Sequence, residues 1–481
     1  MIDSHLLPRT DGYIDGQWVE ADSGERLDVT NPATGEVIAQ VPRMSAAETQ
    51  RAIEAATRSL ATPLRLEDRR RVLERIVTAL QEHRREIGRI LTQEHGKPLA
   101  EAEAEVDYAA GFFRYCAANI DALQPRILDE KPRGLSWRVF YRPAGVVGLI
   151  TPWNFPIGMI AKKLSAAIAA DCASVIKPSS KTPLTMIALF RVLEDVGLPQ
   201  GRVNLVMGPA GPISDCLCEH PAVRCVSFTG STEVGRQLME KCAPGLKRVT
   251  LELGGNAPFI VFADANLDHA ADQLLANKFR GSGQTCVCAN RILVHQDVAD
   301  AFTEKVAERV ARLSVGNGME AGVDIGPLID AKGFNKVRRH AEDALQQGAR
   351  LVVGEIPDAA ESDWGCFYPP TVIDGVRRDA IVGCEETFGP LVAITRFSSD
   401  DEALEMANDT EFGLAAYLFT ADEARAERAI RSLHFAHVGH NTGSGPAPEA
   451  PFGGMLQSGF GREGGIEGLF EFVEPQTVPR G

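Results

Sequence analysis

A cysteine stands in a glycine-rich segment at residues 281–291, Gly-Ser-Gly-Gln-Thr-Cys-Val-Cys-Ala-Asn-Arg. Small neighbours let the sulfur of Cys286 approach a substrate carbon, because little side-chain bulk lies around it. A thiolate adds readily to an aldehyde, and the resulting thiohemiacetal can lose a hydride to leave a reactive thioester. A buried structural role is the ordinary one for any of the ten cysteines, but this setting favours a nucleophile.

Two further side chains could complete this chemistry. Glu252 lies in Thr-Leu-Glu-Leu-Gly-Gly, where flanking leucines would desolvate it, raise its pKa and make it a base for a hydrolytic water. A solvated glutamate at a strand end is the alternative. Asn154, in Pro-Trp-Asn-Phe-Pro, could donate to an oxyanion together with the backbone N–H of Cys286. Local sequence alone favours an asparagine that caps the next helix. The set predicts oxidation of an aldehyde through a thioester.

The elements that must position these residues alternate along most of the chain. Strands and turns are expected over residues 1–40, and helices over 45–119, where apolar residues recur every three or four positions. From Gly145 the order strand–helix–strand predicts a parallel, doubly wound α/β sheet, and a second alternating region runs over about 255–439. The tail after Phe470 is strand-like and is expected to pair with another segment or subunit.

The segment Ser227-Phe-Thr-Gly-Ser-Thr-Glu-Val-Gly235 follows a predicted strand and opens a predicted helix. Glycines and hydroxyls at a helix N-terminus suit a pyrophosphate. The spacing is not Gly-x-Gly-x-x-Gly, so an ordinary capped helix start stays equally open.

Composition excludes several classes of function. The chain of 481 residues is too long for one ordinary core, and its net charge of −15 disfavours nucleic acid and anionic membranes as partners. We expect a cytoplasmic protein, because no apolar run is long enough for a membrane span, no secretory signal is evident and the cysteines lack disulfide-scaffold spacing. His434, His437 and His440 recur every three residues, but no carboxylate or cysteine cluster joins them, so no metal site is predicted.

Taken together, the motifs resemble the NAD(P)-dependent aldehyde dehydrogenase superfamily over nearly the whole chain. The landmarks are Asn-Pro-Ala-Thr-Gly at 31–35, Pro-Trp-Asn-Phe-Pro at 152–156, Lys-Pro at 177–178, Phe-Thr-Gly-Ser at 228–231, Glu-Leu-Gly-Gly at 252–255, Gly-Gln-Thr-Cys at 283–286, Glu-Glu-Thr-Phe-Gly-Pro at 385–390 and Pro-Phe-Gly-Gly at 451–454. The resemblance implies two doubly wound parallel-sheet domains and a small β arm in a homodimer or homotetramer. The implied boundaries are a Rossmann-like cofactor domain at 1–122 and 143–253, a catalytic domain at 254–465 and an oligomerisation arm at 123–142 and 466–481.

The resemblance also assigns roles. It supports Cys286, Glu252 and Asn154 as catalytic residues and implies that Lys177 and Glu386 hold cofactor ribose hydroxyls. The remaining cofactor residues that it implies are Phe388 near the nicotinamide, Ser231 at the pyrophosphate, and Trp153, Ser179, Ser180, Lys181, Gly230 and Leu253. NAD-preferring relatives often carry glutamate where this chain has Ser180, so with Lys181 beside it we expect NADP to be accepted and preferred over NAD.

Within the superfamily, the segments at 278–280 and 284–291 are most similar to succinate-semialdehyde dehydrogenases. That likeness implies that Arg280 grips a substrate carboxylate in a bidentate fork. The predicted substrate-binding residues are Arg280, Lys162, Phe155 and Phe452. Lys162 replaces the second arginine of that subfamily, and Pro446 and Ala447 stand where its substrate-binding serine is expected. A short carboxylate-bearing aldehyde is predicted. Glutarate semialdehyde, 2-oxoglutarate semialdehyde or a general aliphatic aldehyde stay open.

Three rival functions are weighed against this one. A CoA-acylating dehydrogenase typically lacks a base at the position of Glu252, and a non-catalytic relative has no need of the complete set of three. A cysteine hydrolase would turn over an ester without a nicotinamide. Cys288 could form a disulfide with Cys286 as a redox switch, and inert packing is at least as good an interpretation.

Overall fold

Four helices follow the strands and turns at the start of the chain, as predicted from the sequence. The computed structural model describes residues 2–481. The opening strands are β1 (Gly12–Ile14), β2 (Gln17–Val19), β3 (Arg26–Thr30) and β4 (Val37–Pro42), and the helices are α1 (Ala46–Ser59), α2 (Leu66–Glu82), α3 (Arg84–His95) and α4 (Leu99–Asn119). α1 begins where predicted, because the Ser45 backbone N–H donates to the Glu48 side chain at 2.8 Å in a capping box.

The first sheet is built from the alternation that starts near residue 145. Its further strands are β7 (Val146–Ile150), β8 (Ala173–Lys177), β9 (Val203–Leu205), β10 (Val223–Thr229), β11 (Arg248–Glu252) and β21 (Gly459–Phe460). The helices between them are α5 (Gly158–Ala169), α6 (Leu184–Glu194), α7 (Ala210–Glu219) and α8 (Thr232–Cys242). The strand order is β2-β1-β9-β8-β7-β10-β11-β21. β7, β8 and β9 are buried along their whole length, which explains why their sequences show no polar–apolar alternation.

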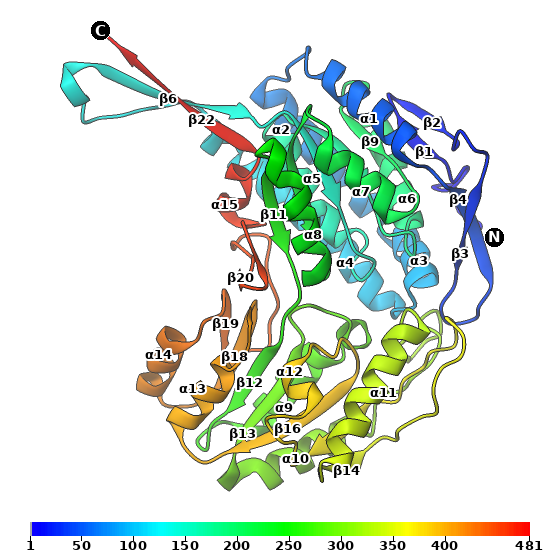
Figure 1. The fold of residues 1–481 in the computed structure, drawn as a ribbon, viewed down its shortest axis with the longest axis vertical. Helices are drawn as coiled ribbons and strands as arrows, with labels where there is room; N and C mark the ends of the chain where they lie inside the picture. Colours follow the sequence, from blue (N-terminus) through cyan, green and yellow to red (C-terminus); the bar gives the residue numbers. More distant parts are fainter. Residues whose placement is uncertain (1) are drawn as a thin grey trace.

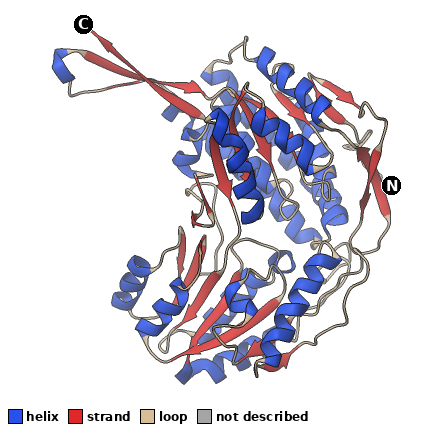
Figure 2. Cartoon of the chain, viewed as in Figure 1, coloured by secondary structure: helices blue, strands red, loops and turns tan. Residues whose placement is uncertain are grey.

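The second sheet follows directly after β11. Its strands are β12 (Ala257–Val261), β13 (Ala289–His295), β14 (Arg350–Val353), β15 (Thr371–Asp374), β16 (Leu391–Phe397), β18 (Ala415–Phe419) and β19 (His437–His440), in the order β14-β15-β16-β13-β12-β18-β19. The helices are α9 (Leu267–Lys278), α10 (Gln296–Val310), α11 (Ala331–Gln346), α12 (Ile381–Cys384), α13 (Asp400–Asn408) and α14 (Glu423–Ser432). Figure 1 shows the two sheets in separate lobes, and Figure 2 shows helices on both faces of each sheet.

The predicted α/β class with parallel-sheet domains is confirmed, although both sheets are mixed at their edges. β1, β2 and β21 run antiparallel in the first sheet, and β14 does so in the second. Short connections explain the β1–β2 pair, because a two-residue turn can join only antiparallel strands. β21 lies inside the stretch expected to belong to the catalytic domain, yet it pairs with β11 of the first sheet.

The tail forms an arm that projects away from both lobes (Figure 1). β22 (Val473–Arg480) pairs antiparallel with β6 (Ser136–Pro143) over its whole length, and β5 (Arg126–Ile127) completes a three-stranded sheet. α15 (Gly465–Phe470) leads into β22, and the small strands β17 (Phe412–Gly413) and β20 (Met455–Leu456) pair separately. The tail therefore pairs with another segment of its own chain, which is one of the two expected outcomes.

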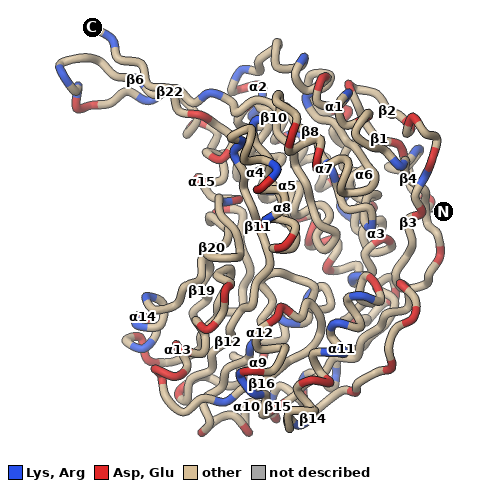
Figure 3. The backbone as a smooth tube through the Cα atoms, in the orientation of Figure 1, with Lys and Arg blue, Asp and Glu red and all other residues tan. Residues whose placement is uncertain are grey.

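Charge is spread over the whole molecule. Figure 3 shows acidic and basic residues interspersed on both lobes and on the arm. None of the helices within residues 2–481 combines the length and apolarity that crossing a membrane requires.

A buried ion pair lies beneath the N-terminal ends of β8 and β9, where Asp171 faces Arg202. The Arg202 guanidinium also donates to the Ser59 and Thr62 carbonyls at 3.0 and 2.7 Å, which ties the α1–α2 connection to the sheet. Asp171→Asn should lower the free energy of unfolding by about 3–5 kcal/mol, because it leaves a buried guanidinium without a counter-charge. The shift of the urea midpoint measures this effect.

Asp15→Asn is the matched control. Asp15 is also an aspartate with positive φ that pairs with an arginine, but its pair with Arg58 is exposed. Its loss should cost only about 0–1 kcal/mol. Equal losses in the two variants would contradict the role assigned to the buried pair.

Candidate active site

Cys286 lies in the loop that joins α9 to β13, and close backbone contacts shape this loop. Gly281 and Gly283 both have positive φ, at 57° and 77°. A Cβ at Gly283 would lie 2.4 Å from the Gly389 carbonyl oxygen, and one at Gly255 would lie 2.8 Å from that of Cys286. The sequence suggests that these glycines give access to the sulfur. The structure shows that they are also needed for the loop backbone to fit between its neighbours.

The Asn154 side chain points toward the Cys286 loop. Its Nδ2 donates to the Gln284 carbonyl at 2.9 Å, and the side chain is buried. An amide nitrogen carries two hydrogens, so one remains for an oxyanion. The capping alternative is wrong, because the first N–H groups of α5, those of Ile157 and Gly158, donate to Glu105 Oε1 at 3.0 and 3.1 Å.

Glu252 ends β11 as a buried carboxyl group, and neither of its oxygens has a hydrogen-bond partner among residues 2–481. The pKa of Glu252 is raised well above its ordinary value, first by burial and then by the nearby Glu463 carboxylate, while Lys162 and Lys163 act against the shift. The alternative of a solvated strand-end glutamate is wrong. A Cβ at Gly453 would lie 2.8 Å from Glu252 Oε1, so the Pro-Phe-Gly-Gly motif clears space for this carboxyl.

Sequence reasoning missed the charged group behind Glu252. Glu463 forms a buried ion pair with Lys163, and Lys163 also donates to Ser227 Oγ at 2.9 Å. Lys162 Nζ lies 4.0 Å from Glu463 Oε2. Together with Glu252, these charges come from three separate stretches of chain, so no local pattern could have grouped them.

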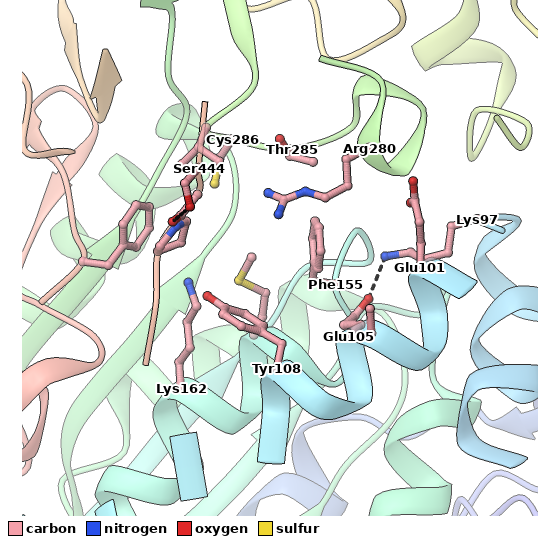
Figure 4. A pocket seen from close by; sticks show the side chains of 16 residues that line it. Lys97, Glu101, Glu105, Tyr108, Phe155, Lys162, Arg280, Thr285, Cys286 and Ser444 are labelled. Carbon is pink, nitrogen blue, oxygen red and sulfur yellow. Dashed lines mark hydrogen bonds and ion pairs between the residues drawn. The ribbon is translucent and has the colours of Figure 1, made fainter. Parts of the chain in front are cut away.

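One cavity, of about 230 Å³, is lined by all four predicted substrate-binding residues and by Cys286 (Figure 4). Lys162 Nζ lies 4.5 Å from the centre of the Phe452 ring, and the Arg280 guanidinium carbon lies 5.5 Å from that of Phe155. The cavity therefore presents two cations against aromatic walls beside the thiol. This composition fits an aldehyde with an anionic end.

The opposite wall of this cavity comes from α4 and the residues before it, which sequence analysis did not single out. Lys97 pairs with Glu105 at 2.6 Å and donates to the Asn154 carbonyl at 2.8 Å, and the Gly281 N–H donates to Glu101 at 2.8 Å. The available signal was the spacing of Glu101, Glu105 and Tyr108 by four and three, which places polar groups on one helix face. Ser444, Gly445 and Pro446 also line the cavity.

A second cavity, of about 370 Å³, meets the first at Cys286. It is lined by six of the predicted cofactor residues, Trp153, Gly230, Ser231, Leu253, Glu386 and Phe388, and by Asn154. The Phe388 ring packs edge-on against Trp153 at 5.6 Å, and Phe388 adopts a φ of 60°, which is uncommon outside glycine. The Gly255 N–H donates to Glu386 at 3.2 Å, and burial raises the pKa of Glu386 to about 7.

Ser231 serves as the cap of α8, accepting from the Val234 N–H at 3.4 Å, and also lines this cavity. The capped-helix and anion-site interpretations of residues 227–235 are therefore compatible.

The other four predicted cofactor residues do not line this cavity. They are Lys177, Ser179, Ser180 and Lys181. Burial lowers the pKa of Lys177 to about 8. Lys181 forms an ion pair with Asp330, which does line the cavity and caps α11. Sequence analysis missed Asp330 and its neighbours Lys332 and Lys336, although an aspartate before a helical stretch is a recognisable cap.

The remaining singled-out residues have local partners. His437 Nε2 lies 2.9 Å from the Ser444 carbonyl oxygen, and His440 Nε2 lies 3.1 Å from Asn441 Nδ2. The buried Cys288 thiol donates to the Lys278 carbonyl at 3.5 Å. A redox switch at Cys288 stays a prediction.

Comparison with known proteins identifies the family to which the chain belongs. The model of the Aldehyde dehydrogenase family matches residues 18–478. The chain belongs to this family. It is 46% identical over 470 residues to a glutarate-semialdehyde dehydrogenase of Pseudomonas aeruginosa, with 97% of each chain covered. It is 46% identical over 474 residues to a succinate-semialdehyde dehydrogenase [NADP(+)] of Escherichia coli, with 98% of each covered. The crystal structure of an oxidoreductase from Marinobacter aquaeolei superposes with a TM-score of 0.98 at 60% identity, and each chain is covered completely.

Aldehyde dehydrogenases are oxidoreductases that act on aldehydes with NAD or NADP, and the second cavity of this member fits such a dinucleotide. Thr229 Oγ1 on its wall is buried and lacks a partner within the described chain. The N-terminus of α8 would offer backbone N–H groups to a pyrophosphate, while the Gly230 N–H already donates to the Glu252 carbonyl at 3.0 Å. Glu386 on the same wall would hold ribose hydroxyls.

The state of the thiol in this aldehyde dehydrogenase can be tested directly. Burial raises the pKa of Cys286 to about 12, while Lys162 acts against the shift. Without ligands, the rate of alkylation of Cys286 by iodoacetamide should therefore still climb about tenfold per pH unit beyond the ordinary thiol value of 9.0. Peptide mass spectrometry follows the reaction, with the exposed Cys384 as an internal reference. Lys162→Met should slow alkylation, and a rate that levels off below the ordinary value would contradict the expectation.

Proposed function

We propose that this aldehyde dehydrogenase oxidises a short aldehyde with a distal carboxylate, of the succinate semialdehyde type, to the dicarboxylic acid. The observation that carries the proposal is the cavity where Arg280 and Lys162 face Cys286 across aromatic walls. Arg280 holds the carboxylate in a bidentate fork, Lys162 adds a second positive charge, and Phe155 and Phe452 enclose the chain between them. The names of the two curated relatives support a semialdehyde.

The reaction begins with the thiolate of Cys286, which adds to the aldehyde carbon to form a carbon–sulfur bond and an alkoxide. The Asn154 amide and the backbone N–H of Cys286 donate to this alkoxide, and such a donor typically contributes ~10²–10³ in rate. The residues of the second cavity would hold a nicotinamide dinucleotide, which would supply the hydride acceptor for this carbon. The product on the enzyme is a thioester of Cys286.

Glu252 completes the cycle. In its ionised form it takes a proton from a water that attacks the thioester carbon, which releases the acid and returns the thiol. Its raised pKa makes the ionised carboxylate a stronger base than an exposed glutamate. A base at this position supports hydrolysis over transfer to CoA. A separate cavity that fits a dinucleotide supports a dehydrogenase over a cysteine hydrolase or a non-catalytic relative.

Glutarate and 2-oxoglutarate semialdehydes, or a general aliphatic aldehyde, are the alternative substrates. Pro446 and Ala447 replace the serine of the succinate-semialdehyde subfamily, and Pro446 lines the cavity. The relative named for glutarate semialdehyde is as similar to this chain as the one named for succinate semialdehyde.

We assign the dinucleotide to the six residues that line the second cavity, with Lys177, Ser179, Ser180 and Lys181 at its adenosine ribose. Ser180 gives no repulsion toward a 2′-phosphate, so NADP is the preferred cofactor. The arm built from β6 and β22 is assigned to a homodimer or homotetramer contact. All ten cysteines fall within the described residues and are free, which supports the reducing cytoplasm.

Arg280→Ala tests the substrate assignment. The variant should lose roughly 10- to 100-fold in kcat/KM for succinate semialdehyde, because hydrogen bonds to a charged group are removed. It should oxidise butanal as well as the parent enzyme does. Steady-state rates with saturating NADP measure both. A parent enzyme that turns over butanal as well as the semialdehyde would overturn the proposal.

Ser180→Glu tests the cofactor assignment. A carboxylate there should repel the 2′-phosphate and lower kcat/KM for NADP by at least about tenfold, with little change for NAD. Ser180→Ala, which adds no charge, is the control and should keep the preference. The assignment fails if Ser180→Glu leaves the NADP:NAD ratio unchanged.

A further inference from the structure

The substrate cavity has more buried hydrogen-bond donors than the chain can satisfy. Tyr108 Oη, Arg280 Nε and Thr285 Oγ1 all belong to residues lining it, and each is buried with no partner anywhere in residues 2–481. A buried donor left unpaired costs about 1–3 kcal/mol. All three groups can donate, so together they call for a ligand that brings acceptor oxygens.

Tyr108 is the member of this set with no assigned role. It projects from α4 with its hydroxyl directed toward the Lys162 ammonium and the centre of the cavity (Figure 4). Lys162 has donors and no acceptor, so it cannot receive the phenolic proton. Burial raises the pKa of Tyr108, which keeps the hydroxyl protonated and able to donate.

The ring of Tyr108 is held in place by packing. It lies edge-on to Phe112 at 4.9 Å, and a Cβ at Gly158 would approach it to 3.3 Å. A donor fixed in this way loses little conformational freedom when a ligand binds.

In the wall formed by residues 444–446, the Ser444 hydroxyl donates to the Gly445 carbonyl at 3.3 Å, and the place where a serine is expected offers no donor. Pro446 has no side-chain donor and no backbone N–H, and Ala447 has no side-chain donor. Gly445 lies so near Arg280 that a Cβ there would be 3.1 Å from Nη2. In this chain, Tyr108 on α4 therefore adds an unpaired hydroxyl to the cavity, in addition to that of Thr285.

We propose that the Tyr108 hydroxyl donates to the distal carboxylate of the substrate and, with Arg280 and Lys162, determines specificity for anionic aldehydes. This inference rests on the proposed function. A carboxylate has about four lone-pair sites on two oxygens, enough to accept from the arginine fork, the ammonium and the phenol together. The substrate class is thus an aldehyde whose compact anion is surrounded by donors of three kinds.

Tyr108→Phe removes this donor and little else. It should raise KM for succinate semialdehyde by about tenfold, the effect of one hydrogen bond to a charged group, with kcat nearly unchanged. Butanal, which lacks the anion, should be oxidised with parental constants. Binding of succinate, measured by calorimetry as a readout independent of turnover, should weaken by the same factor.

Tyr115→Phe is the matched control. Tyr115 is on the same helix but does not line the cavity, and the variant should behave like the parent enzyme in every assay.

The possible outcomes distinguish a failure of the role assigned to Tyr108 from a failure of the proposed function. If Arg280→Ala loses the semialdehyde preference while Tyr108→Phe keeps the parental KM and succinate affinity, the function stands and the role of Tyr108 is overturned. If Tyr108→Phe weakens both aldehydes equally, its role is packing, which also overturns the inference. If the parent enzyme shows no preference for the semialdehyde, the proposed function fails and the inference fails with it.

Discussion

The buried carboxylate of Glu105 connects the parts of this site. One oxygen accepts the N–H groups of Ile157 and Gly158, and the other pairs with Lys97. Lys97 in turn donates to the Asn154 carbonyl. The segment that carries Asn154 is therefore fixed at both ends by one charge pair. A buried pair of this kind is tolerated only when nearly every lone pair and proton is used, as is the case here.

The fixed segment lies between two cavities, and both cavities reach the sulfur of Cys286. Cys286 lies where the larger cavity meets the smaller one, and Asn154, which lines the larger cavity, donates to the Gln284 carbonyl in the Cys286 loop. One reacting atom can thus face an aldehyde from one side and a dinucleotide from the other. The glycines at 255 and 283 allow the loop to approach its neighbours closely, because a Cβ at either position would collide with the neighbouring backbone.

Electrostatics around the sulfur are balanced. Burial works against charge on Cys286 and Glu252, which raises the pKa of both groups in the structure. Lys162 stabilises both anions, and Arg280 also stabilises the thiolate. The two cations of this cavity therefore favour the thiolate of Cys286, and Lys162 also favours the ionised form of Glu252.

Local sequence was sufficient to single out Cys286 and Glu252 and to predict the alternation of strands and helices. These depend on glycine turns, flanking leucines and periodicity, which act over a few residues. It was not sufficient for Asn154, whose local context favours a helix cap, because its partner, Gln284, is far away in the sequence. The same reason hid the pairing of Lys181 with Asp330, whereas Glu105 and Tyr108 share a helix-face spacing that does not by itself indicate a cavity. The sequence by itself determined which chemical groups this protein has and the class of sheet that carries them. Only the tertiary structure decided which of those groups share a cavity, because burial and charge pairing join segments that no local pattern connects.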